Sequence, residues 1–211
     1  MRKDPLSNPL SGAVHNWLGA VLAGGQSTRF GRPKWSEPLA GVPMARRAAA
    51  ALAPHAREVV LVGAAGDASG LGLPLVPDAP GGGGPLAGLV SALERAERAG
   101  DRGCLMVACD LPLVDADLVG LLVQAWDGED LVAPERGGRL QPLCAAWSVA
   151  ALPAVRKALV SDDRSVAGVV RGLALKILPE ATWRAGASGL DRLLNVNTPA
   201  DLARAVEELA R

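Results

Sequence analysis

Hydrophobic residues in this chain follow two different periods, one typical of strands and one typical of helices. Runs that are apolar on both faces occur at 18–23, 58–63 and 104–109, and such runs are typical of central parallel strands covered by helices. A weaker run at 73–77 contains Pro74, which favours an edge position. The pattern therefore predicts a sheet with buried central strands and one edge strand.

Helical spacing occupies the intervals between these runs. Pro43 can begin an Ala-rich helix that continues to about Ala53. Apolar residues recur at i, i+3, i+4 and i+7 from Leu86 to about Ala99, and again after Asp115, a favourable N-cap. Thr198 is expected to cap the last helix. The buried stripes are expected at Leu86, Leu89, Val90 and Leu93, at Leu118, Leu121, Leu122 and Ala125, and at Leu202, Val206 and Leu209.

Two more strand-like runs, 131–134 and 140–147, are close enough in sequence to form an antiparallel pair. The alternation of strands and helices predicts an α/β fold. We expect a single-domain, Rossmann-like three-layer sandwich whose central sheet is mostly parallel, with one antiparallel strand pairing in the second half. Residues 1–16 are expected to form a flexible leader, and 17–211 the domain.

Charge and composition exclude several classes of function. Lys and Arg number 22, as do Asp and Glu, so the formal net charge is zero, whereas nucleic-acid and anionic-membrane binders normally carry a basic excess. Aromatic residues make up only 3% of the chain, too few for the platforms on which the bases of single-stranded nucleic acid stack. No run approaches the roughly 18 apolar residues of a membrane span. The sequence predicts a cytoplasmic protein without nucleic-acid or membrane partners.

The cysteines and histidines give no sign of thiol chemistry. Cys104, Cys109 and Cys144 are an odd number with no paired spacing, and we expect them to be small buried hydrophobic residues. His15 and His55 lie in weakly patterned segments and are expected to be ordinary surface residues.

Glycines and cations gather directly after the first predicted strand. The segment from Leu22 to Lys34 reads Leu-Ala-Gly-Gly-Gln-Ser-Thr-Arg-Phe-Gly-Arg-Pro-Lys. Small residues let backbone amides approach an anion closely, and Arg29 and Lys34 add two positive charges, as a triphosphate requires. Neither a P-loop nor a GxGxxG motif is present. The alternative is a glycine-rich turn with solvated cations.

Three further segments follow predicted strands or precede predicted helices. Asp110 ends the third strand, where a carboxylate can hold Mg²⁺, although it could instead shape a turn before Pro112. Glycines at 81–84 suit close approach to a ligand or a flexible surface loop. Asn195 and Asn197 face the same way if their segment is extended, or they serve local turns and caps.

In this order, the segments resemble the nucleotidyltransferase family that makes the guanine dinucleotide form of the molybdenum cofactor. The family's opening pattern, L-A-G-G-x-S-x-R-M-G-x-x-K, is similar to the segment from Leu22 to Lys34, with Phe30 in place of Met. The resemblance spans roughly residues 17–211. The family's G-P-L-A-G, C-D-x-P, Q-P-L-x-A-L-Y and N-x-N-T-P-x-D-L patterns resemble Gly84 to Gly88, Cys109 to Pro112, Gln141 to Trp147 and Asn195 to Leu202.

The resemblance implies a Mg²⁺-dependent enzyme that moves GMP from GTP to the phosphate of molybdopterin or its molybdenum-bound form, with release of pyrophosphate. Asp78 would accept hydrogen bonds from guanine N1–H and N2–H₂. Transient contacts with other cofactor-biosynthesis proteins or molybdoenzymes are also implied. By position, the catalytic residues would be Arg29, Lys34 and Asp110; the nucleotide-binding residues Leu22, Ala23, Gly24, Gly25, Lys34, Gly63, Asp78, Gly84 and Asp110; the second-substrate residues Gln141, Asn195 and Asn197; and the metal ligands Asp110 and Asn197.

The sequence departs from the family pattern at positions that bear on base choice. Pro33 stands where the family often has Asp, Gly63 where relatives can carry an Asn that contacts the nucleotide, and Trp147 in place of Tyr. One alternative is the cytidine-adding relative, although its opening motif usually reads L-A-A-G. Another is a sugar-1-phosphate nucleotidyltransferase, although those tend to be longer. A non-catalytic nucleotide-binding regulator and a dehydrogenase fit less well.

Overall fold

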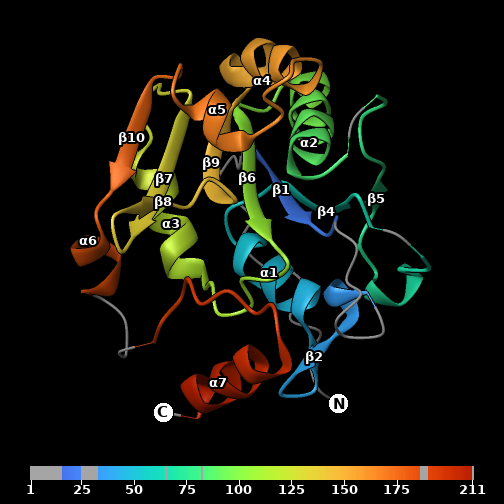
Figure 1. Ribbon diagram of the computed structural model, residues 1–211, viewed down its shortest axis with the longest axis vertical. Helices are drawn as coiled ribbons and strands as arrows, with labels where there is room; N and C mark the ends of the chain where they lie inside the picture. Colours follow the sequence, from blue (N-terminus) through green and yellow to red (C-terminus); the bar gives the residue numbers. More distant parts are fainter. Residues whose placement is uncertain (1–15, 25–32, 65, 82, 186–189, 211) are drawn as a thin grey trace.

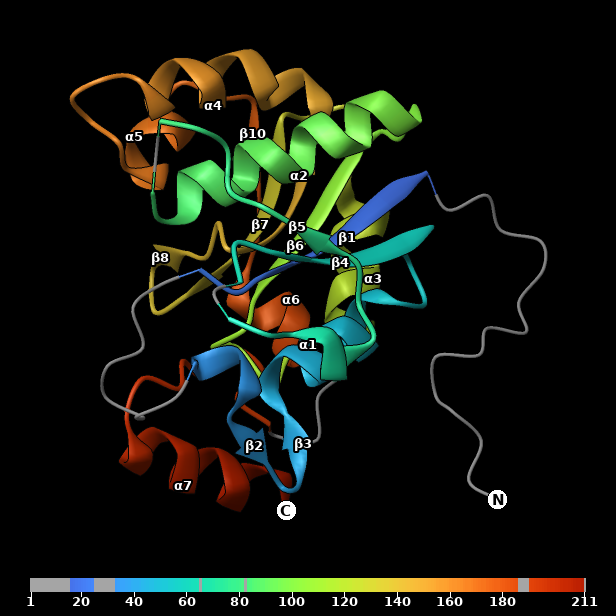
Figure 2. The same ribbon diagram turned by 90° about the vertical axis from the view of Figure 1, so that its right-hand side faces the viewer.

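The apolar runs form the strands of one central sheet, which lies between two helical layers (Figures 1 and 2). The computed structural model describes residues 16–24, 33–64, 66–81, 83–185 and 190–210. The strands of the sheet are β1 (Trp17–Leu22), β4 (Glu58–Val62), β5 (Leu75–Val76), β6 (Gly103–Ala108), β7 (Leu131–Arg136), β8 (Arg139–Leu140), β9 (Cys144–Ser148) and β10 (Leu175–Leu178). A separate small hairpin contains β2 (Pro38–Leu39) and β3 (Val42–Pro43).

Strand direction is uniform along the main path of the sheet except at β9. The order is β10-β7-β9-β6-β1-β4-β5, with β8 paired to β7. β9 runs antiparallel to both β6 and β7, whereas β1 pairs in parallel with β4 and β6. The predicted antiparallel pair and the mostly parallel three-layer sandwich are therefore confirmed, and β5 is an edge strand as Pro74 indicated.

Helices cover both faces of the sheet. They are α1 (Met44–Leu52), α2 (Pro85–Ala99), α3 (Ala116–Ala125), α4 (Leu152–Leu159), α5 (Val166–Val170), α6 (Glu180–Arg184) and α7 (Pro199–Leu209), with 3-10 turns η2 (Lys34–Ser36), η3 (Ser69–Leu71) and η4 (Val149–Ala151). Residues of α1 and α3 pack in one hydrophobic cluster, and those of α2 and α4 in another.

The central strand β1 shows how the sequence pattern produces this arrangement. All six of its residues are buried. Trp17 and Val21 belong to the cluster with α1 and α3, while Leu18, Ala20 and Leu22 belong to the cluster with α2 and α4. Because successive side chains of a strand point to opposite faces, a strand covered on both sides must be apolar at every position.

The predicted stripe of the last helix is only partly right. Leu202 packs against the small cluster beneath α7, but Val206 and Leu209 are 43% and 37% exposed, while Ala205 and Glu208 are buried. The helix lies at the lower end of the molecule (Figure 1), where it covers a loop and β2 rather than the sheet. A narrow contact of this kind buries a single line of side chains, some small and some polar, instead of a broad apolar stripe.

Several elements were not predicted, because their patterns are short or irregular. Helices α4, α5 and α6 span 8, 5 and 5 residues. Strand β10 has only four residues, of which Lys176 and Ile177 are exposed, and it pairs with β7 at the edge of the sheet. Segments of this length carry little periodicity, and tertiary contacts decide their conformation.

The remaining expectations about the chain concern its ends, cysteines and histidines. The proposed leader lies outside the described residues apart from Asn16. All three cysteines are buried and free, as predicted. His15 also lies outside the described residues, and His55 is partly buried with its Nε2 atom 2.8 Å from the carbonyl oxygen of Ala116, a packing contact rather than a free surface position. Among the described residues, no helix is long and apolar enough to cross a membrane.

Candidate functional site

Three parallel strands end side by side at one edge of the sheet. The N–H of Ala23, just after β1, donates to the carbonyl oxygen of Val62 at the end of β4, at 2.8 Å. The N–H of Cys109, just after β6, donates to the carbonyl oxygen of Leu22, at 2.9 Å. In open α/β sheets, ligands bind beyond the carboxyl ends of the strands. The segments that follow β1, β4 and β6 therefore share the edge where a ligand is expected.

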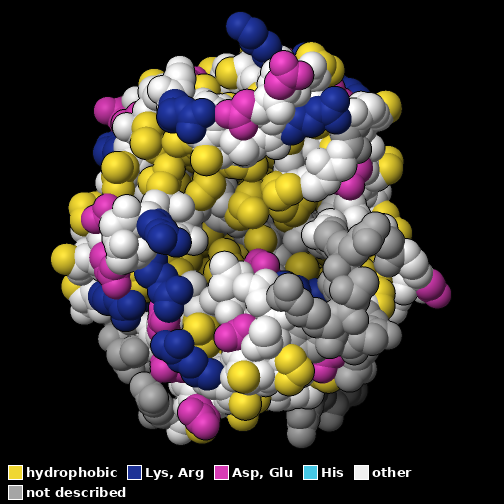
Figure 3. Space-filling view, in the orientation of Figure 1, with side chains coloured by type: hydrophobic (Ala, Val, Ile, Leu, Met, Phe, Trp, Pro, Cys, Tyr) yellow, Lys and Arg dark blue, Asp and Glu magenta, His cyan; other side chains and the backbone are white. Residues whose placement is uncertain are grey.

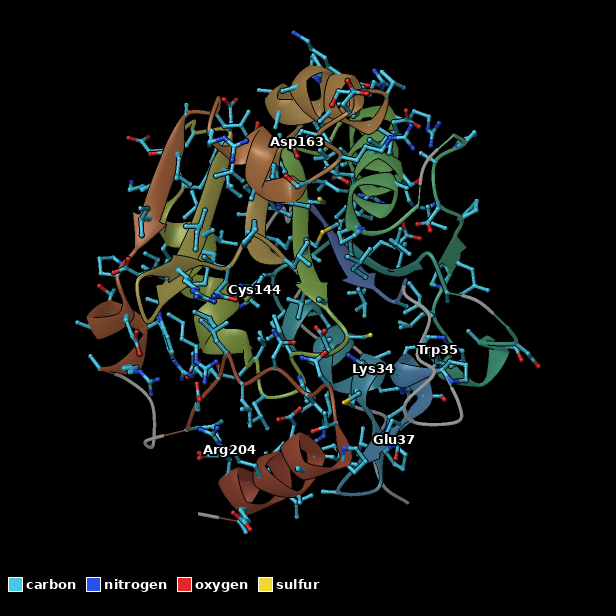
Figure 4. All side chains as sticks on the ribbon, in the orientation of Figure 1. Lys34, Trp35, Glu37, Cys144, Asp163 and Arg204 are labelled. Atoms are coloured by element: carbon cyan, nitrogen blue, oxygen red, sulfur yellow. The ribbon has the colours of Figure 1, made fainter. Side chains whose placement is uncertain are left out.

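A lysine, an aspartate and an asparagine from distant segments meet at this edge. The Nζ atom of Lys34 lies 2.7 Å from Oδ1 of Asn197 and 3.5 Å from Oδ2 of Asp110. Lys34 begins η2, Asp110 follows β6, and Asn197 precedes α7 (Figure 4 labels Lys34). Lys34 therefore contacts both other side chains that the sequence assigned to the metal.

Backbone contacts fix the segment that carries the two asparagines. The N–H of Val196 donates to the carbonyl oxygen of Asp110 at 2.8 Å. Val196 is fully buried, whereas Asn195 and Asn197 are exposed, so the asparagines lie on the same side of an extended segment. The prediction that they face the same way is thus consistent with the burial pattern.

The cap of α7 holds Asn197 in place. Thr198 and Asp201 form a capping box, and the Asp201 carboxylate also accepts the N–H of Asn197 at 3.0 Å. The bond to Asn197 and the bonds to Thr198 lower the pKa of Asp201, which keeps it ionised. Asp201 was expected to belong only to the closing motif. The structure adds a bond to the backbone of Asn197, the residue that contacts Lys34.

Asp110 experiences two opposing effects. Burial raises its pKa, while the charge and hydrogen bond of Lys34 lower it. The exposed fraction is 27% for the Asp110 side chain and 18% for that of Lys34, so the pair is poorly solvated and weakly screened. Lys34 thus helps to keep Asp110 ionised.

A second carboxylate lies in a niche formed by glycines. Oδ1 of Asp78 is buried without a hydrogen-bond partner, and burial raises the pKa of Asp78. A Cβ atom built at Gly63 would lie 2.5 Å from Oδ1, one at Gly88 would lie 3.3 Å from Oδ1, and one at Gly24 would lie 3.9 Å from Oδ2. Buried polar atoms are normally paired, so an orphaned oxygen at this edge is a candidate acceptor for a ligand. Gly88 was not among the predicted binding residues; its signal was the family-like motif from Gly84 to Gly88.

The oxygens of Asp110 and Asn197 suit a divalent cation. Both already contact one cationic group, the Lys34 ammonium. Within the described part of the chain, no group of three or more His, Cys, Asp or Glu side chains could hold a metal. Mg²⁺ commonly takes one or two protein oxygens and completes its shell with water and phosphate oxygens. The donors present therefore fit a cation that is bound together with a phosphorylated substrate.

The other predicted site residues lie in different settings. Gly84 caps α2 with φ +75°, and Leu22, Ala23 and Gly24 are at the end of β1. Gln141 lies between β8 and β9, where its side-chain amide donates to the carbonyl oxygen of Arg139 at 3.0 Å. This local bond does not join it to the Lys34 cluster. The predictions for Gly25 and Arg29 fall outside the described residues.

One face of the molecule is hollowed and largely apolar (Figure 3). Figure 3 shows hydrophobic side chains gathered beneath α4 and α5, with Lys and Arg side chains along one flank. An apolar hollow with a charged margin suits an organic molecule that carries an anionic group.

The sheet and the family match place this protein in a class, the nucleotidyltransferases of α/β fold. Residues 19–182 match the profile of the MobA-like NTP transferase domain, and the chain belongs to this family of nucleotidyltransferases. The resemblance noted from the motifs is confirmed.

Named relatives cover most of the chain. It is 38% identical over 195 residues to the molybdenum cofactor guanylyltransferase of Rhodobacter capsulatus, covering 90% of this chain and 95% of the relative. It is 35% identical over 189 residues to a probable molybdenum cofactor guanylyltransferase of Pelotomaculum thermopropionicum, covering 89% and 90%. The crystal structure of molybdopterin-guanine dinucleotide biosynthesis protein A from Archaeoglobus fulgidus superposes with a TM-score of 0.75 at 26% identity, covering 92% and 98%.

Proposed function

We propose that this protein transfers GMP from GTP to the terminal phosphate of molybdopterin, or of its molybdenum-bound form, and releases pyrophosphate. The observation that carries the proposal is the contact of Lys34 with Asp110 and Asn197 at the carboxyl edge of a MobA-like sheet. The names of the relatives supply the nucleotide and the acceptor. The residues that meet at the edge suit these substrates: Lys34 can contact phosphate groups, and the oxygens of Asp110 and Asn197 can contact a divalent cation.

The chemistry requires positioning and charge stabilisation rather than a protein nucleophile. An oxygen of the acceptor phosphate attacks the α-phosphorus of GTP in line, the bond from that phosphorus to the bridging oxygen of pyrophosphate breaks, and pyrophosphate leaves with the electron pair. Lys34 offsets negative charge as it develops on the phosphates. Arg29 would do the same, because it stands at the arginine of the family's opening motif. The buried cysteine thiols take no part: the pKa of Cys109, next to Asp110, is raised to about 12, mainly by burial.

Asp110 and Asn197 would hold a divalent cation, with Mg²⁺ as the expected ion. When bound, this cation would neutralise phosphate charge and orient the triphosphate for in-line attack. The contribution of this chain is to hold Asp110 ionised through Lys34 and to fix Asn197 through the cap of α7.

The nucleoside would lie beyond β1, β4 and β5. The motifs imply that Leu22, Ala23, Gly24, Gly25 and Gly84 would lie beside the nucleotide, where glycines let a ligand approach the backbone closely. Asp78 would accept the N1–H and N2–H₂ groups of guanine, and its orphaned Oδ1 is the supporting observation. Gly63 has no side chain with which to contact the base.

The acceptor would lie on the other side of Asp110, toward Asn195, Asn197 and Gln141. The apolar hollow in Figure 3 supports an organic acceptor. We also propose that residues 17–211 form one catalytic domain, that residues 1–16 are a leader, that the protein works in the cytoplasm, and that it contacts other cofactor-biosynthesis proteins or molybdoenzymes transiently.

Replacing Asp110 tests the proposal directly. We expect Asp110→Ala to abolish pyrophosphate release from GTP and molybdopterin while circular dichroism and the melting temperature remain close to those of the parent protein. Glu97→Ala removes an exposed carboxylate near the far end of α2 and serves as the control. Pyrophosphate release by Asp110→Ala at the parent rate would refute the metal and catalytic assignment.

Thermal shift with GTP, CTP, ATP and UTP, each with Mg²⁺, tests the choice of base. We expect GTP to raise the melting temperature most. Stabilisation by CTP alone would show that the protein belongs to the cytidine-adding branch.

A further inference from the structure

The carboxylate of Asp78 rests directly against the backbone of Gly63. The three heavy atoms nearest to a Cβ built at Gly63 all belong to this carboxylate: Oδ1 at 2.5 Å, Cγ at 3.0 Å and Oδ2 at 3.1 Å. Gly63 also has φ +70°, a conformation that residues with side chains rarely adopt. No side chain could therefore occupy position 63 without moving Asp78.

The backbone around this contact is fixed by the sheet. The N–H of Gly63 donates to the carbonyl oxygen of Val76, the last residue of β5, at 3.0 Å. Asp78 follows two residues later, and the N–H of Ala79 donates to the carbonyl oxygen of Ala87 in α2 at 3.3 Å. The freedom that remains is rotation of the Asp78 side chain, which Gly63 limits on one side and Gly88 on another.

We infer that Gly63 is a positioning residue for base selection, which holds the Asp78 carboxylate at the angle where it accepts two N–H groups from one edge of a purine. The inference rests on the proposed function and adds to it the residue on which guanine selectivity depends in this chain. Selectivity comes from the Asp78 carboxylate alone. Its direction depends on Gly63, because any side chain at position 63 would occupy the space that the carboxylate fills.

A methyl group at position 63 should displace the carboxylate. The close contact involves the end of a flexible side chain, which moves easily, whereas the hydrogen bond from Gly63 to Val76 involves backbone only. Lys34, Asp110 and Asn197 do not touch Gly63. Gly63→Ala should therefore lose the preference for guanine.

Comparison of GTP with inosine triphosphate measures this preference, because inosine lacks the 2-amino group of guanine. We expect the parent protein to favour GTP by about 10- to 100-fold in kcat/KM, the range for one hydrogen bond to a charged acceptor. In Gly63→Ala and in Asp78→Asn the ratio should fall to within about threefold of unity. The loss should appear in KM and in the Kd of GTP.

Two further variants separate positioning from general damage. Gly66→Ala places a methyl at φ +87° with no atom within 4 Å, so it carries the same kind of backbone strain without the contact, and it should keep the GTP preference. Asp78→Glu keeps the charge and leaves Gly63 untouched but moves the carboxylate by one methylene, and it should lose the preference even if Gly63→Ala does not fold.

The outcomes distinguish the inference from the proposed function. If Asp78→Asn keeps the ratio, Asp78 does not read the base, and both the proposed base contact and the inference fail. If Asp78→Asn loses the ratio while Asp78→Glu or folded Gly63→Ala keeps it, only the inference fails. Loss of the ratio in Gly66→Ala would show that backbone strain, not the contact with Asp78, controls selectivity.

Discussion

At the scale of single residues, Lys34 joins two parts of the site that are far apart in sequence. Its ammonium contacts Asp110 and Asn197, which are 76 and 163 positions away. The sequence indicated a cation after β1 and a carboxylate after β6, but not that an amide oxygen would accept the shorter of the two bonds. Neighbouring strand ends made the first contact foreseeable, whereas the second depends on how the last loop packs.

Removing this ammonium should change both the rate and its pH dependence. We expect Lys34→Met to lower kcat by about 10²- to 10³-fold, as for other lost donors to developing negative charge. Because Lys34 lowers the pKa of Asp110 against the effect of burial, its loss should raise that pKa further. Asp110 would then become protonated at higher pH, and the acidic limb of the pH–rate profile should move to higher pH.

Pyrophosphate release measured across pH checks both effects, with Lys157→Met on the exposed side of α4 as the control. An acidic limb that stays in place, or moves to lower pH, would contradict the role of Lys34 in keeping Asp110 ionised.

At the scale of elements, the cap of α7 combines stability with positioning of the site. Thr198 as the cap and Pro199 in the first turn could be foreseen from the local pattern, and the capping box is present. The buried line of the helix could not be foreseen, because α7 covers a loop and β2 instead of the sheet. Helix periodicity indicates that a helix has an apolar face, but the element packed against the helix decides which of its residues are buried.

Loss of this cap should therefore lower both stability and activity. We expect Thr198→Ala to reduce the free energy of unfolding by about 1 kcal/mol and to lower kcat several-fold, because Asn197 loses its support next to Lys34. Thermal denaturation and pyrophosphate release measure the two effects.

Ser148→Ala is the matched control for this change. Ser148 accepts the N–H of Ala150 at the start of η4, and it pairs with Gly103 at the opposite edge of the sheet. This variant should lose stability without a comparable loss of kcat. Equal losses of kcat in the two variants would mean that stability alone explains the effect at Thr198.

At the scale of the whole molecule, the reversed strand β9 connects the two halves of the sheet. It lies between β6 and β7 and is antiparallel to both. Its approach to β6 is very close at one point: a Cβ atom at Gly103 would coincide with the carbonyl group of Trp147. Trp147 is fully buried, and its indole N–H donates to the carbonyl oxygen of Pro142 at 2.8 Å.

Gly103→Ala should therefore disrupt the assembly of the sheet. The contact involves backbone that cannot rotate away, so we expect a loss of about 3 kcal/mol or more in the free energy of unfolding, measured by urea denaturation. Gly70→Ala, where a Cβ meets no atom within 4 Å, should leave the denaturation midpoint nearly unchanged. A parent-like midpoint for Gly103→Ala would show that β6 and β9 can separate without cost.

The sequence alone determined the buried strands β1, β4 and β6, the helices α2 and α3, and the cap of α7. It also determined the glycine-rich and polar segments that follow the strand ends. These features depend on side-chain period and on hydrogen bonds between residues a few positions apart. Tertiary structure decided the place of β9 and β10 in the sheet, the exposed face of α7, the niche that Gly63 forms for Asp78, and the contact of Lys34 with Asn197. Each of these depends on which surfaces pack together in the folded chain, and local pattern carries no information about that choice of partner.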